Sequence, residues 1–126
     1  MGAVAGPNII VLMLTAMEHD LQARINMKMD SQMLLSMQSI FFGNAKAALY
    51  QQMQSCTPDS PQWKQIQVQV YQLECRERAI QTLEKTLDME MKRLQAQLEM
   101  VQKRKEGAEK MRQKNTEDAF SYGHGR

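Results

Sequence analysis

The chain has 126 residues, of which 43% are hydrophobic and 6% aromatic, and its net charge is +2. Residues 1–60 carry three basic and four acidic side chains, while residues 61–126 carry thirteen basic and ten acidic ones. Neither half has the single-sign charge typical of nucleic-acid binding, so we expect no nucleic-acid partner. The length is that of one domain, and the patterns described next predict an elongated helical pair rather than a globule.

The first predicted helix runs from Asn8 to Ser55, and Asn8 is suited to cap its N-terminus. The apolar run at residues 9–17 is far shorter than the ~20 residues needed to span a bilayer, so we expect no transmembrane segment. No Lys or Arg precedes Arg24, which argues against a secretory signal peptide. We therefore expect signal-less export to the cell surface or medium, with a cytoplasmic location as the alternative.

Apolar residues continue along this helix mostly in steps of four, which gives a stripe broader than a coiled-coil seam. Residues 33–42 are apolar nearly all round, and a helix of that composition is buried on more than one side. Gly43 predicts either a local kink in one helix or a tight joint between two. The residues expected to lie between subunits, two of them in the C-terminal tail, are Ile9, Val11, Leu12, Met13, Met33, Leu34, Met37, Ile40, Phe41, Phe42, Phe120 and Tyr122.

A turn is predicted at residues 56–60, and its key residues are Pro58, Asp59, Ser60 and Pro61. Pro58 disfavours helix at the preceding residue, while Ser60 before Pro61 predicts an N-cap followed by proline in the first helical position. A short connection between two long helices predicts an antiparallel αα-hairpin.

The second predicted helix spans residues 61–114 and carries an apolar heptad pattern over about six heptads. The same series places three charged residues, Glu77, Glu84 and Lys105, at seam positions. We expect a flexible tail at residues 115–126. The apolar seam predicted to pack against the first helix contains Ile66, Val70, Leu73, Ile80, Leu87, Met91, Leu94, Leu98 and Val101.

The predicted fold is therefore all-α, a single domain of two long antiparallel helices that resembles a coiled coil. Two such helices have more apolar surface than one hairpin can cover, which predicts assembly into a higher-order helical polymer.

No pattern of titratable residues indicates catalysis. His19 stands between Glu18 and Asp20, and adjacent helical residues point to different faces, so these three cannot chelate one ion. Cys56 and Cys75 form no CxxC pair and are expected to be free thiols. We expect a protein that is not an enzyme and has no catalytic, cofactor or metal site.

Around the turn and along the second helix, the sequence contains Pro58-Asp59-Ser60-Pro61, Tyr71, Arg78-Ala79-Ile80-Gln81-Thr82, Lys85 and Asp88. Residues 57–88 resemble the hairpin subunits of type III secretion needles. Needle subunits are shorter, and the further helix at residues 89–114 is more similar to the longer filament subunits of the same secretion systems. The resemblance implies a subunit that secretion machinery exports without a cleaved signal and that polymerises by burying helix faces.

We therefore expect a structural subunit that assembles with copies of itself into a helical filament or tube. The alternative is an intracellular coiled-coil adaptor, such as an export-ATPase stalk or a secretion chaperone. The apolar patch at residues 33–42 favours self-assembly, because a solitary stalk should not expose it.

Overall fold

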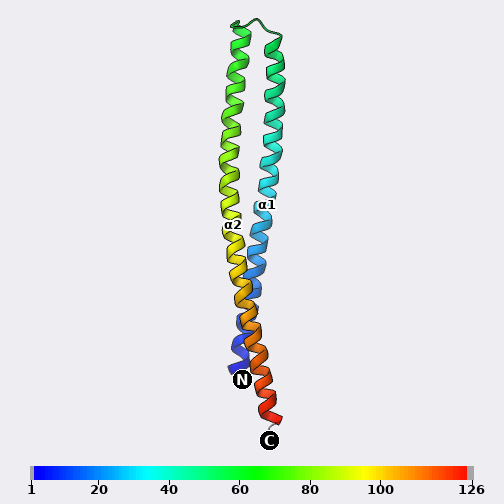
Figure 1. The fold of residues 1–126 in the computed structure, drawn as a ribbon, viewed down its shortest axis with the longest axis vertical. Coiled ribbons are helices and arrows are strands. Elements are labelled where there is room, and N and C mark those ends of the chain that lie inside the picture. Colours follow the sequence, from blue (N-terminus) through cyan, green and yellow to red (C-terminus); the bar gives the residue numbers. More distant parts are fainter. Residues whose placement is uncertain (1, 125–126) are drawn as a thin grey trace. The chain divides into compact units, whose positions relative to one another are not determined.

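The computed structural model describes the backbone of residues 2–124, and the side chains of this range except for residues 2–5, 7 and 120–124. It contains helix α1 (Gly2–Gln54) and helix α2 (Pro61–His124), and the described part has no strand (Figure 1). The prediction of an all-α hairpin of two long helices is confirmed.

The hairpin divides into two units. Unit 1 combines Met1–Met27 of α1 with Met91–Arg126 of α2, and unit 2 is the continuous segment Lys28–Glu90, which includes the turn. In each unit, a stretch of α1 lies beside a stretch of α2 that runs in the opposite direction (Figure 1).

The start of α2 is fixed by an N-cap, as the sequence predicts. The backbone N–H of Trp63 donates to Ser60 Oγ at 3.2 Å, and the N–H of Lys64 donates to the Ser60 carbonyl at 3.0 Å. Ser60 is therefore the N-cap, and Pro61 occupies the first helical position, where its missing N–H costs nothing.

The turn itself closes through one backbone hydrogen bond. The N–H of Ser60 donates to the carbonyl of Thr57 at 3.0 Å, and Asp59 has a φ of 62°. Proline in the second position and a left-handed residue in the third are typical of a type II turn. The sequence Thr57-Pro58-Asp59-Ser60 fits this geometry because Asp tolerates the left-handed region better than most residues.

Both helices extend beyond their predicted ends. Helix α1 begins at Gly2, so Asn8 lies inside the helix and does not cap it. Helix α2 continues to His124, so the predicted tail is helical from residue 115 to residue 124. This segment contains no proline. The Thr116 hydroxyl donates to the Arg112 carbonyl at 2.9 Å, a hydrogen bond within the helix that does not interrupt it.

Helix α1 is continuous through Gly43, so the sequence alternative of two helices joined there is wrong. Gly43 costs a helix interior about 1 kcal/mol relative to alanine, which strong helix formers on both sides can offset. A Cβ atom at this position would meet no neighbour within 4 Å.

Unit 1 has a continuous apolar core. Leu98 of α2 packs against this core at its edge. One ion pair also joins the two helices of unit 1, between Lys105 Nζ and Glu18 Oε1 at 3.5 Å. The buried members of the core are Val11, Leu14, Leu21 and Ile25 of α1 and Leu94, Val101 and Ala108 of α2.

Unit 2 buries less apolar surface. Val70 and Ile80 are its only buried hydrophobic residues, and all residues of this unit lie in the described part of the chain. Polar contacts also join its two helices: Lys28 Nζ lies 2.6 Å from Glu90 Oε2, Lys46 Nζ lies 3.3 Å from Glu77 Oε2, and Tyr50 donates to Glu74 at 3.3 Å.

Candidate functional site

The α2 residues predicted for the hairpin seam all lie on the side of α2 with reduced exposure. Val70 and Ile80 in unit 2, and Leu94 and Val101 in unit 1, are buried. The remaining five are half-buried: Ile66, Leu73, Leu87, Met91 and Leu98.

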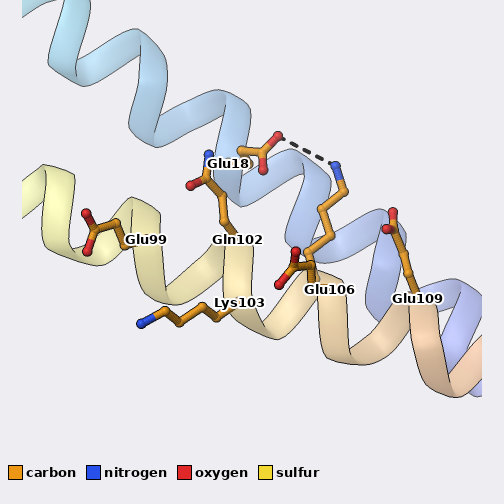
Figure 2. A pocket seen from close by; sticks show the side chains of 7 residues that line it. Glu18, Glu99, Gln102, Lys103, Glu106 and Glu109 are labelled. Carbon is orange, nitrogen blue, oxygen red and sulfur yellow. Dashed lines mark ion pairs between the residues drawn. The ribbon is translucent and has the colours of Figure 1, made fainter.

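Two of the three charged seam positions form ion pairs with α1. Glu77 pairs with Lys46 in unit 2, and Lys105 pairs with Glu18 in unit 1, where Figure 2 shows the contact between the two helices. Glu77 Oε1 is buried and accepts no hydrogen bond, so this pair is incompletely satisfied. Polar groups at seam positions cost stability but specify which residues of the partner helix must lie opposite.

Helix α1 has a seam of its own, which sequence analysis missed. Its buried and half-buried residues alternate in steps of three and four, but several are polar, so a search for apolar residues overlooks the series. Matching opposite charges between the two helices would have located this series, because Lys28 and Lys46 of α1 pair with glutamates of α2. The members are Val11, Leu14, Glu18, Leu21 and Ile25 in unit 1 and Lys28, Gln32, Leu35, Ser39, Phe42, Lys46, Leu49 and Met53 in unit 2.

Most α1 residues predicted to lie between subunits are exposed in the hairpin. Eight of them are 56–70% exposed. Met29, which was not among the predicted contact residues, is exposed as well. The eight are Ile9, Leu12 and Met13 in unit 1 and Met33, Leu34, Met37, Ile40 and Phe41 in unit 2.

The other four predicted interface residues are not among these exposed residues. Val11 is buried in the core of unit 1, so its assignment to a subunit contact is wrong: it occupies a position of the α1 seam. Phe42 is half-buried, and its ring meets that of Phe41 edge to face at 5.8 Å. Phe120 and Tyr122 lie outside the described side chains.

The exposed apolar residues of α1 in unit 2 form one surface, here called the outer face. No charged residue occurs between residues 31 and 45. In the same stretch, the seam that faces α2 contains the polar residues Gln32 and Ser39. The segment therefore places two polar side chains inside the hairpin, beside Leu35 and Phe42, and large apolar ones outside. The outer face consists of Met29, Met33, Leu34, Met37, Ile40 and Phe41.

Two open hollows lie in unit 1. The one in Figure 2 has a volume of about 440 Å³, and its charged side chains are spread along the two helices without converging on one point. The other, of about 350 Å³, has an apolar floor that includes Leu21 and Val101 and a rim that includes Arg24 and Arg104. The hollow in Figure 2 is lined by Glu18, Glu99, Gln102, Lys103, Lys105, Glu106 and Glu109.

Among the described residues, no group of three or more His, Cys, Asp or Glu side chains could hold a metal ion. Cys56 is half-buried, Cys75 is exposed, and both are free thiols, as expected. Neither helix, as far as it is described, combines the length and hydrophobicity needed to cross a membrane.

Comparisons with protein-family models, with curated proteins and with solved structures found no match to this chain.

Proposed function

We propose that this protein is a non-enzymatic structural subunit that assembles with copies of itself into a helical filament or tube. The observation that carries the proposal is the outer face, where six large apolar side chains lie exposed and five of them belong to residues 31–45, which carry no charge. Contiguous exposed apolar surface of this kind marks an interaction site, because removing apolar side chains from water is favourable.

A polymer needs more than one contact surface, since a single self-complementary surface closes at a dimer. A second apolar surface is available in unit 1, where Ile9, Leu12 and Met13 of α1 are also exposed. In this proposal, the outer face makes one contact and the unit 1 residues make the other, so that subunits can add without limit.

The resemblance of residues 57–88 to secretion-needle hairpins supports a subunit that is exported and polymerises outside the cell. This part of the proposal is tested by fractionating cells that produce the protein. Polymer in the medium or on the cell surface, with an uncleaved N-terminus by mass spectrometry, supports export. A protein confined to the cytosol in a stoichiometric complex with another protein supports the adaptor alternative.

The assembly itself is tested with the variant Met37→Lys, which places a charge in the centre of the outer face. Negative-stain microscopy at high protein concentration should show polymers for the wild type and none for the variant, while circular dichroism shows the same helix content for both. The matched control is Met89→Lys, which changes an equally exposed methionine of unit 2 on α2 and should leave polymers intact. Wild-type particles of monomer size, or polymers formed by Met37→Lys, would contradict the proposal.

A further inference from the structure

We infer that the outer face of unit 2 pairs with the same face of a second copy, with the two α1 helices antiparallel and a two-fold axis beside Met37. The inference rests on the proposed self-assembly and specifies one of its contacts. It is drawn from the area of the outer face, from the absence of charge at residues 31–45, and from two polar residues near the ends of the face.

The area of the outer face is close to what a specific interface requires. Its six side chains are 52–67% exposed. Taking about 200 Å² for a large side chain that is fully exposed, the face presents on the order of 700 Å². A standard protein interface buries about 800 Å² on each partner, so this face and its immediate neighbours suffice for one.

The lack of charge makes the outer face complementary to itself. Residues 31–45 contain no acidic or basic side chain, so two copies can approach along this stretch without burying a charge. A charged partner would gain nothing from such a surface. A second copy offers an apolar helix face of the same length and width.

Asp30 and Asn44 decide the orientation of the two helices. Each is seven residues from Met37, which is about two helical turns, so both lie on the same side of α1 as Met37 at opposite ends of the face. Both are exposed. A parallel pair would place the two Asp30 carboxylates side by side, where like charges repel each other.

An antiparallel pair centred on Met37 removes that repulsion. Asp30 then lies opposite Asn44 of the second copy, and a carboxylate can accept a hydrogen bond from an asparagine amide. The two Asp30 side chains stand about 20 Å apart, at 1.5 Å per residue over fourteen residues. The two helix dipoles also run in opposite directions.

The same register matches the apolar side chains. Met33 lies opposite Phe41 of the second copy, a favourable contact between sulfur and an aromatic ring, and Leu34 lies opposite Ile40. Met37 meets itself on the two-fold axis, where an unbranched and flexible side chain can adapt to its own copy.

Cysteine cross-linking tests this register. In a background of Cys56→Ala and Cys75→Ser, which removes both free thiols, Met37→Cys should form a disulfide-linked dimer under mild oxidation. Asp30→Cys in the same background should form about tenfold less, because its two thiols would be held far apart. A mixture of Asp30→Cys and Asn44→Cys chains should yield the mixed dimer. If Met37→Cys weakens assembly, a mixture of Leu34→Cys and Ile40→Cys chains reports the same register.

Sedimentation of each variant separates the outcomes. If Asp30→Cys links to itself as readily as Met37→Cys, the helices are parallel and the inference is wrong, although assembly stands. If the cysteine-free background sediments as a polymer but neither Met37→Cys nor the Leu34 and Ile40 mixture cross-links, another face makes the contacts and the inference is again wrong. If wild type and background are monomers at every concentration, the proposed function fails as well.

Discussion

Units 1 and 2 differ in where their apolar side chains lie. In unit 1, seven buried hydrophobic residues form one core between the helices. In unit 2, Val70 and Ile80 alone are buried, and ion pairs also join the helices, while six large apolar residues of α1 lie exposed. Unit 1 can derive its stability from its own packing. Unit 2 exposes apolar side chains on α1. This surface stabilises the protein only when another molecule covers it.

The contrast continues along the seam of α1, whose spacing of three and four is the same in both units. In unit 1 its members are mostly apolar, whereas in unit 2 they include Lys28, Gln32, Ser39 and Lys46. The heptad spacing therefore brings the two helices together in both units, but only in unit 1 does it also bury a continuous apolar core. Four sets of variants test this difference, beginning with the one expected to have the largest effect.

Ile25→Ala should have the largest effect, because Ile25 is only 4% exposed in the core of unit 1. Loss of its buried methyl and methylene groups should lower the free energy of unfolding by about 2–4 kcal/mol. Met37→Ala, on the outer face of unit 2, should change it by less than about 0.5 kcal/mol in dilute protein. Urea unfolding measures both, and equal losses would show that the two units do not differ as described.

Lys46→Met should lower the free energy of unfolding by about 1–2 kcal/mol. It leaves Glu77, one of whose oxygens already lacks a hydrogen bond, without its cation, and the partial exposure of both side chains reduces the cost. Adding Glu77→Leu should restore most of the loss, since apolar residues can replace a poorly satisfied ion pair. A double-mutant cycle in urea checks this, and additive losses from the two changes would contradict it.

Ser60→Ala removes the oxygen that accepts the Trp63 N–H and should cost about 1 kcal/mol. The loss should appear as faster hydrogen exchange in the first turn of α2, while amides in the core of unit 1 keep their protection. If amide exchange became faster by the same factor in both units, the units would unfold together and would not differ in local stability.

Asp59→Gly should have the smallest effect, a gain of a few tenths of a kcal/mol, because glycine relieves the positive φ of Asp59 but also loses more entropy on folding. Asp59→Val should instead lose about 1–2 kcal/mol, since a β-branched residue is strained in the left-handed region. Thermal unfolding distinguishes the two, and a stabilising valine would show that the turn adopts another geometry.

The sequence was sufficient to predict the hairpin, because Pro58, Ser60 and Pro61 have strong local preferences and the α2 heptads repeat without interruption. It did not predict the helix ends at Gly2 and His124, because Asn8 after Pro7 is a local start signal although it lies inside α1. It also did not separate the two sides of α1. The α1 seam includes polar residues, so a search for apolar residues does not find it. Val11 was therefore assigned to a subunit contact although it lies in the core of unit 1.

The most direct test of the central claim compares the oxidation rates of Met37 and Met89 by hydrogen peroxide across a range of protein concentrations. The two methionines are 60% and 71% exposed in the single chain, and an accessible thioether oxidises to the sulfoxide. We expect similar rates in dilute protein and selective protection of Met37, together with Met33, as the concentration rises. Equal oxidation of Met37 and Met89 at every concentration would show that no second copy covers the outer face.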